Sequence, residues 1–329
     1  MRGQRIEKIF AVVSYFSGFD AVCHFFTRKR KRVIMYHNVL PESIMRDDVA
    51  NSFTTSENGF RRDIRYFKRK YGISNDLDDV ARVAISFDDG FKSQGEIAGR
   101  IMEAEGDLPA MIFCAGAVVD ATSPKDTLAV ERVLHWVSNA PDEAIAKLGV
   151  ATREAVWPKV VWPRFRGDWR EKGEGVCRWL DGIYPFAKVI SSLPPEYVRL
   201  RLTGLTREDL DMLRHKGWLV CWHTQSHFPL KMLPEEEQKR EMAPPDEMRG
   251  LPFAYPYGDA GCVGGETIRL AQDLGFKVAF ASCPQKQDNP YFISRYATSE
   301  GRIMFHYHFS GARFAIRRML KALGIVKVV

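Results

Sequence analysis

The feature that most limits how this chain can fold is the alternation of short apolar runs with longer stretches of helical spacing. Apolar runs over Val33 to Tyr36, Val83 to Phe87 and Ala110 to Cys114 are typical of strands buried on both faces. Helical patterns over Phe60 to Tyr71 and Glu96 to Glu105 separate them. This order predicts an α/β fold with a mainly parallel sheet or barrel.

The alternation breaks between about Ser123 and Pro195, a stretch rich in Trp, Pro and Arg that contains Trp157-Pro158 and Trp162-Pro163. We expect a helical insertion there, which either forms part of a substrate cleft or only covers the barrel. The alternation then resumes, with helices expected over Arg207 to His215 and Thr267 to Leu274, and strands over Trp218 to Trp222, Phe253 to Tyr255 and Val278 to Phe280.

The first 32 residues differ from the rest of the chain. Ile9 to Phe26 is fairly apolar, but it is too short and too interrupted by polar residues for a membrane span, and no Ala-x-Ala cleavage site follows it. Its spacing predicts an amphipathic helix, and the basic run Arg28 to Arg32 predicts either a solvated turn or a peripheral contact with anionic membrane. We therefore expect an N-terminal helix and basic turn over 1–32, a main domain over 33–310 and a C-terminal helix over 311–329.

Composition and charge narrow the class of protein. A hydrophobic content of 45% in 329 residues fits a globular chain and excludes a disordered or fibrous one. The net charge of +7 suits an anionic partner, but no nucleic-acid recognition motif accompanies it, so we expect no nucleic acid. The six cysteines are scattered without a CxxC pair, which predicts free thiols in a reducing compartment. Without a clear signal peptide, we expect the chain in the cytoplasm or at the membrane periphery.

The first motif is Ser-Phe-Asp-Asp-Gly at residues 86–90, at the end of an apolar run. Consecutive strand residues point to opposite faces, so Asp88 and Asp89 serve one cleft only where the strand breaks. Gly90 supplies the backbone freedom for that break. A bare Asp-Asp-Gly is by itself more typical of an acidic turn.

The second motif is His-Thr-Gln-Ser-His at residues 223–227, again directly after an apolar strand. His223 and His227, at i and i+4, share one face of a helical turn and form a natural pair of ligands for one ion. Alone, such a pair is equally typical of an incidental arrangement. With one carboxylate it gives three protein ligands and leaves an open position for water, as hydrolysis requires.

The third motif is Phe-Ala-Tyr-Pro-Tyr-Gly-Asp at residues 253–259. Pro256 and Gly258 fix a sharp turn at a strand end, where a backbone N–H can be left unpaired and aimed inward. As a lone turn signal, this motif has little weight.

In this order, the three motifs resemble those of the polysaccharide deacetylase family, the NodB-homology or carbohydrate esterase family 4 proteins. Residues 86–90 resemble the family's first motif, residues 223–227 its His-Ser/Thr-x-x-His, and Pro-Tyr-Gly the end of its third. Val-Ile-Met-Tyr-His at residues 33–37 is similar to the opening strand of exopolysaccharide-type members. The resemblance spans roughly residues 33–296 and implies a distorted (β/α) barrel with fewer than eight regular strands.

The resemblance also implies roles for the motif residues. Asp89, His223 and His227 would bind a divalent metal ion, most often zinc, and Asp88 would be the catalytic base. The backbone N–H of Tyr257 would stabilise the oxyanion, and the Pro-Tyr-Gly turn would contact the substrate, an N-acetylated saccharide. These roles fit hydrolysis, because a metal polarises the acetyl carbonyl, a base deprotonates the attacking water and an N–H meets the negative oxygen.

One departure concerns an arginine. The family's third motif often has an Arg three residues before its Phe, where it orients the base. Here that position is Gly250, with Arg249 beside it. Arg295, in Ile-Ser-Arg-Tyr, is the expected substitute.

The second departure concerns the general acid. The family's Leu-x-x-His is matched only loosely by residues 303–306, which end on His306. His308 and His37 are rivals, and His37 sits at a strand end that we expect to open on the same cleft. The sequence leaves the three histidines open.

The expected activity is removal of an acetyl group, N-linked in our interpretation, from an amino sugar of a polysaccharide, oligosaccharide or glycolipid. O-deacetylation or deformylation on the same site is the nearest alternative, because these reactions pass through a similar intermediate. A saccharide-binding protein that has lost catalysis is the alternative of another class. Asp88, which chemistry needs but metal or sugar binding does not, favours the enzyme.

Overall fold

The computed structural model describes residues 2–27, 31–282, 289–298 and 302–322. Cys283 and basic residues 28–30 of the predicted turn lie outside the described residues, as does the predicted C-terminal helix beyond residue 322. The five described cysteines are free thiols, as the sequence predicts.

The main sheet is parallel throughout and closes into a barrel. Its strand order is β10-β1-β4-β5-β6-β7-β8-β9, and only Arg295 separates β9 from β10. This one segment therefore pairs with β8 on one side and with β1 on the other, which confirms a distorted (β/α) barrel. The strands are β1 (Arg32–Tyr36), β4 (Val83–Asp89), β5 (Met111–Cys114), β6 (Leu219–Trp222), β7 (Phe253–Ala254), β8 (Ala279–Ala281), β9 (Ile293–Ser294) and β10 (Tyr296–Ala297).

Alternate residues of the strands separate an inner from an outer core. Apolar side chains such as Ala84, Phe113 and Ala254 cluster inside the barrel. Their neighbours along the strands, such as Ile85 and Ile112, join the larger core beneath the helices. The continuous apolar runs in the sequence arise because both faces of each strand are buried.

The helices around the barrel follow their sequence patterns. In α3 (Glu57–Lys70), Phe60, Ile64 and Phe67 are buried at helical spacing, and the Ser56 side chain caps the first turn by accepting a hydrogen bond from the Gly59 N–H. The other covering helices are α4 (Arg100–Ala104) with the π-helical turn before it (Gln94–Gly99), α12 (Arg207–His215), α13 (Glu235–Met242) and α14 (Gly265–Asp273). A small parallel pair, β2 (Asn38–Leu40) and β3 (Thr54–Ser56), follows β1.

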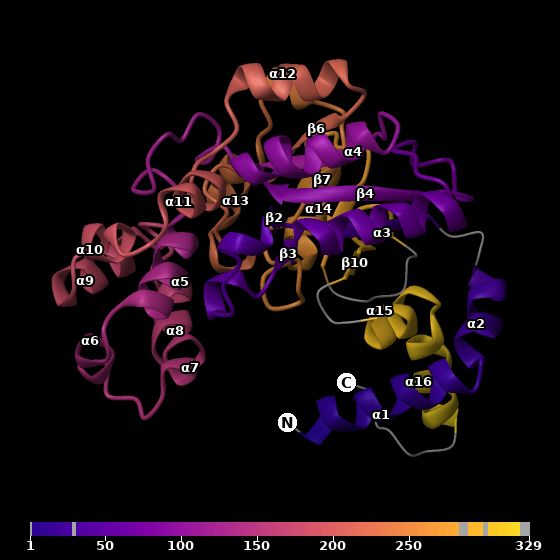
Figure 1. The fold of residues 1–329 in the computed structure, drawn as a ribbon, viewed down its shortest axis with the longest axis horizontal. Helices are drawn as coiled ribbons and strands as arrows, with labels where there is room; N and C mark the ends of the chain where they lie inside the picture. The colour runs from indigo at the N-terminus through magenta and orange to yellow at the C-terminus, as the bar shows by residue number, and fades with distance from the viewer. Residues whose placement is uncertain (1, 28–30, 283–288, 299–301, 323–329) are drawn as a thin grey trace.

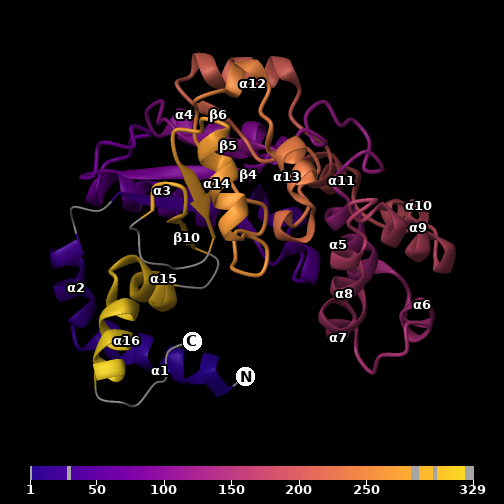
Figure 2. The ribbon, with the colours of Figure 1, turned by 180° about the vertical axis from the view of Figure 1, so that it is seen from behind.

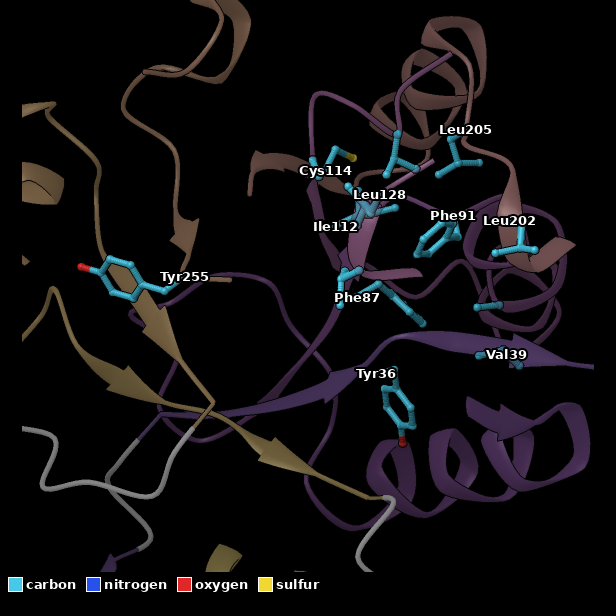
Figure 3. Packing of buried hydrophobic residues seen from close by; sticks show 14 of the residues in the cluster. Tyr36, Val39, Phe87, Phe91, Ile112, Cys114, Leu128, Leu202, Leu205 and Tyr255 are labelled. Carbon is cyan, nitrogen blue, oxygen red and sulfur yellow. The ribbon is translucent and has the colours of Figure 1, made fainter. Parts of the chain in front are cut away.

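The segment between β5 and β6 carries the helical insertion, which lies to one side of the barrel in Figure 1. Its core is continuous with that of the barrel. Figure 3 shows Leu128 and Leu202 of the insertion near Phe91 and Ile112. The insertion helices are α5 (Ala129–Asn139), α6 (Asp142–Ala146), α7 (Arg153–Val156), α8 (Trp162–Gly167), α9 (Glu174–Ile183), α10 (Phe186–Ser191) and α11 (Pro195–Leu202).

The two ends of the chain meet in a second packing unit, visible in both ribbon views (Figures 1 and 2). Helices α1 (Arg2–Phe16), α2 (Phe19–Thr27), α15 (Arg302–Phe309) and α16 (Ala312–Ala322) share a small core of their own, and we call them the terminal helix unit. The predicted N-terminal helix is present as two helices, because Gly18 turns the chain at a φ of +77°. Among the described residues, no single helix is long and apolar enough to cross a membrane, although residues 7–16 and 19–27 meet that test as a pair bent by 88°.

Candidate metal centre

All three motifs lie at the carboxyl edge of the barrel. Asp88 and Asp89 end β4, the motif at residues 223–227 follows β6, and the Pro-Tyr-Gly turn follows β7. Parallel strands deliver these ends to one side of a barrel, where the loops after the strands build the site. Residues more than 130 positions apart are brought together because β4, β5, β6 and β7 are consecutive neighbours in the sheet.

Asp89, His223 and His227 form a group that fits one metal ion. The Asp89 Oδ1 atom lies 3.3 Å from His227 Nε2 and 3.7 Å from His223 Nε2. One ligand atom from each residue lies within 4.8 Å of the others. Bonds of about 2.1 Å arranged as a tetrahedron hold ligand atoms about 3.4 Å apart, so the spacing matches. The buried Oδ1 of Asp89 accepts no hydrogen bond from any described residue, as expected for an atom reserved for a cation.

Hydrogen bonding and burial fix the chemical state of the ligands. The His223 Nδ1–H donates to the Ala254 carbonyl at 2.6 Å, which leaves Nε2 with its lone pair toward Asp89. Burial lowers the pKa of His223 to about 3 and that of His227 to about 4, so both imidazoles are neutral at physiological pH. Burial, with the charge of Asp88, raises the pKa of Asp89 to about 6 in the metal-free protein.

Asp88 points into the barrel and pairs with Arg295. The Nη1 and Nη2 atoms of Arg295 lie 2.6 Å from Oδ1 and Oδ2 of Asp88, a bidentate contact. The guanidinium also lies 5.2 Å from the centre of the Phe113 ring. Only 4% of the Asp88 side chain and 1% of the Arg295 side chain are exposed. Burial alone would raise the pKa of Asp88, but the opposing contributions, of which that of Arg295 is the largest, together lower the pKa to about 2.

The backbone is strained at the site. Seven described non-glycine residues have positive φ, and four of them belong to the motifs. They are Asp89 (+83°), Thr224 (+69°), His227 (+55°) and Tyr257 (+60°). The strand break that the sequence assigns to Gly90 therefore begins one residue earlier, at Asp89 itself. That turn brings Asp89 to the side of its neighbour Asp88, which strand alternation alone would not do.

The third motif supplies Tyr257 and a tight turn. No described residue accepts a hydrogen bond from the Tyr257 backbone N–H. Its ring packs 4.9 Å from the His227 ring and 5.2 Å from the Trp162 ring, centre to centre. A Cβ at Gly258 would lie 2.3 Å from the backbone nitrogen of Ser282, so only glycine fits beside buried Pro256.

The three candidate histidines for the general acid separate clearly. His37 is half-buried directly after β1. Burial lowers its pKa, and the charges of Asp89 and Asp88 oppose this shift without cancelling it. His37 therefore shares the electrostatic environment of the two aspartates. His306 and His308 lie in α15 instead. The ring centres of His306 and Tyr15 are 5.6 Å apart, and His308 Nε2 lies 4.0 Å from a Glu7 oxygen. Both therefore belong to the terminal helix unit, and the loose match to Leu-x-x-His is wrong as a position in the site.

The sequence interpretation missed a buried ion pair in the insertion. Glu131 of α5 lies 2.8 Å from Nη2 of Arg201 in α11, and both are buried. Burial raises the pKa of Glu131; Arg201 opposes the shift and the charge of Asp89 adds to it, so the pair shares the field of the site. A signal was present, because Glu131 lies four residues before His135 on a helix whose buried face is otherwise mostly apolar.

Comparison with known proteins gives matches among solved structures alone. No family model and no curated protein match the chain. A deacetylase of Streptococcus pyogenes in complex with acetate is 14% identical, with a TM-score of 0.48 over 82% of this chain and 92% of that one. A de-N-acetylase from Aggregatibacter actinomycetemcomitans is 14% identical, with a TM-score of 0.48 over 85% and 99%. A polysaccharide deacetylase from Bacillus cereus is 13% identical, with a TM-score of 0.49 over 85% and 68%.

Proposed function

We propose that this chain is a metal-dependent hydrolase that removes an acetyl group, N-linked in its preferred substrate, from an amino sugar of a saccharide. The observation that supports this most is that two adjacent carboxylates have different partners. Asp89 lies with His223 and His227 as a ligand group, while Asp88 beside it is held by Arg295. A cation-binding module needs the first arrangement and has no use for the second.

Each protein group has a separate task in this proposal. A divalent cation, zinc by the one-carboxylate, two-imidazole ligand set, would polarise the acetyl carbonyl and acidify the attacking water. Asp88 accepts the proton of that water. Its low pKa keeps it ionised at every physiological pH, and Arg295 holds both of its oxygens in a fixed direction.

Two further groups act on the substrate side. The Tyr257 backbone N–H donates to the oxygen that becomes negative when water adds to the carbonyl. His37 is the remaining candidate for protonating the leaving amine, because it shares the electrostatic environment of Asp88 and Asp89. Burial lowers its pKa in the metal-free protein, so in this proposal it takes up its proton during the reaction.

The saccharide part of the proposal rests on the resemblance of the three motifs and on the aromatic surroundings. Trp157 and Trp162 of the insertion stack 5.5 Å apart, and Trp162 reaches Tyr257. Aromatic walls with a few polar groups are usual in small-molecule sites, and flat rings suit the apolar faces of sugars. This arrangement supports the reading in which the insertion forms part of the substrate cleft.

The test combines metal analysis with acetate release from a panel of N-acetylated saccharides. In Asp88→Asn, metal content should stay near that of the wild type while turnover falls by ~10²–10⁴-fold, the usual contribution of a general base. In Asp89→Asn, metal should be lost, and excess metal should restore part of the activity.

Wild-type turnover by Asp88→Asn would overturn the role of Asp88 as the base, and a wild type that binds metal but releases no acetate would leave the saccharide-binding alternative. Release of formate, or of acetate only from O-acetylated sugars, would select deformylation or O-deacetylation on the same site. An exchange of behaviour between the two variants would reverse the roles of the two aspartates.

A further inference from the structure

The terminal helix unit presents an apolar surface that neither the barrel nor the metal centre requires. Among the described residues, eleven large hydrophobic side chains are exposed, and seven of them lie in α1 and α2. The seven are Ile9, Val12, Val13, Phe16, Val22, Phe25 and Phe26. Single exposed apolar residues are ordinary on a soluble protein, but a group of this size on two adjacent helices marks a binding surface.

The spacing of these residues makes a stripe on each helix. Those of α1 lie at i, i+3, i+4 and i+7, and those of α2 at i, i+3 and i+4. The opposite sides of the helices, which include Ala11 and Cys23, are buried in the core shared with α15 and α16. Each helix therefore has two apolar faces, of which the protein covers one. Phe16 is 76% exposed and Phe26 79% exposed.

The basic charge of the protein is concentrated in the same two terminal segments. Residues 1–32 contain eight basic and two acidic residues, a net charge of +6, and residues 302–329 contain six basic residues and no acidic one, also +6. Since the whole chain carries +7, residues 33–301 carry a net charge of −5. Arg317, Arg318 and Lys321 are exposed on α16, which packs beside α1 and α2.

We propose that the terminal helix unit docks the protein on an anionic lipid bilayer. The stripes of α1 and α2 enter the boundary between headgroups and acyl chains, and the basic residues of α16 meet the anionic headgroups. The depth is limited to the outer side chains, because the inner faces of both helices stay packed on α15 and α16. The acidic remainder of the protein is repelled by the same surface, which fixes the direction of approach.

The test uses the full-length protein with vesicles of phosphatidylcholine alone and of phosphatidylcholine mixed with phosphatidylglycerol. We expect co-sedimentation with the mixed vesicles, weakening as salt is added. Replacing Phe16 and Phe26 together by Ser should weaken binding to the mixed vesicles by about tenfold or more, because the apolar contribution is lost. Replacing Arg317, Arg318 and Lys321 together by Gln should remove about 100-fold of the preference for anionic vesicles, near fivefold for each charge.

The matched control is Met212→Ser, which removes a side chain that is 57% exposed on α12, outside the terminal helix unit. It should bind vesicles as the wild type does, and all variants should keep wild-type far-ultraviolet circular dichroism and acetate release from a soluble substrate. Equal binding of the wild type to neutral and anionic vesicles would overturn the proposal. So would wild-type binding by the Phe16→Ser, Phe26→Ser protein, or a dimer in sedimentation equilibrium that this variant abolishes, which would assign the surface to a second copy of the chain.

Discussion

The residues that the structure describes include two buried arginine–carboxylate pairs, one in the barrel and one in the insertion, and the pKa values of the two carboxyl groups shift in opposite directions. Arg295 contacts both oxygens of Asp88 at 2.6 Å, and the pKa of Asp88 falls to about 2. Arg201 reaches Glu131 only through Nη2, at 2.8 Å, and the same nitrogen also donates to the Ala50 carbonyl. The pKa of Glu131 rises, because burial, with the charge of Asp89, outweighs the effect of Arg201.

The difference shows that closeness to an arginine does not decide the charge of a buried carboxylate. The fork of a guanidinium offsets the loss of hydration when it meets both oxygens. When the arginine contacts only one oxygen, the effect of burial on the carboxyl pKa dominates. A proton can then neutralise the carboxylate in place of a second contact. The barrel pair is therefore suited to keeping the Asp88 carboxylate ionised, and the insertion pair to holding α5 and α11 together.

The sharpest way to break this comparison is to remove each arginine. Arg295→Met leaves Asp88 as a buried charge without its partner, which should lower the free energy of unfolding by about 3–5 kcal/mol. Because burial would then raise the pKa of Asp88, acetate release should fall by ~10²-fold near neutral pH and partly recover at higher pH. Arg201→Met should cost about 1–3 kcal/mol and leave the shape of the pH–rate profile unchanged, because Glu131 can take up a proton.

Urea unfolding and pH–rate profiles measure both effects, with Arg295→Lys as the control that keeps the charge but not the fork. Equal losses in the free energy of unfolding of the two Met variants, with unchanged pH–rate profiles in both, would mean that both pairs only stabilise the fold.

The comparison sharpens further when both partners of the insertion pair are replaced. Glu131→Gln combined with Arg201→Met removes both buried charges, so the free energy of unfolding should return to within about 1 kcal/mol of the wild type. Acetate release should stay within about tenfold of the wild type, because neither side chain contacts the reacting groups in our proposal. A loss as large as that of Asp88→Asn would instead give the insertion pair a direct part in the reaction.

The smallest expected effect concerns His135, whose Nδ1 lies 2.8 Å from the Glu131 backbone carbonyl oxygen and whose Nε2 lies 2.9 Å from the Tyr197 hydroxyl. Burial, with the charges of Arg201 and Arg46, lowers its pKa from 6.5 to about 3. Between these pH values the unfolded chain binds a proton here and the folded chain does not, so stability falls as pH falls. Each such group contributes up to about 1.4 kcal/mol per pH unit.

The measurement is the free energy of unfolding at pH 7 and pH 5 for the wild type and for His135→Gln. Comparing the two pH values within each protein cancels any constant cost of the substitution. The variant should lose less stability on acidification, and an identical loss in both proteins would contradict the assignment.

The barrel and the ligand group could be predicted from the sequence, because both depend on local patterns with few solutions. Buried parallel strands give continuous apolar runs, and the expected strands agree with the observed ones to within two residues. Asp89 ends one strand, His223 and His227 follow another, and strand ends in a parallel barrel share one edge.

The remainder depends on contacts between distant segments. Residues 303–306 match a histidine motif by spacing, but α15 packs on α1, so His306 lies in the terminal helix unit. The sequence suggests Arg295 only as a substitute for the arginine that is absent at Gly250. Its bidentate contact with Asp88 exists because β9 and β10 close the sheet. Glu131 and Arg201 are 70 positions apart in helices whose packing no local pattern specifies.

Closure of the barrel at Arg295 also determines the order in which the parts of the site can form during synthesis of the chain. Asp88 and Arg295 are separated by 207 residues, so at 5–20 residues per second a ribosome adds the arginine roughly 10–40 s after the aspartate. Until then β1 and β8 have no strand between them, and the carboxylate has no guanidinium to hold it. A nascent chain can therefore bring Asp89, His223 and His227 together while the Asp88 carboxylate is still solvated and unoriented. The proposed catalytic site is therefore completed late, when the last sheet residues are made, and any chain released before residue 295 lacks both the closing strand of the barrel and the arginine that contacts Asp88.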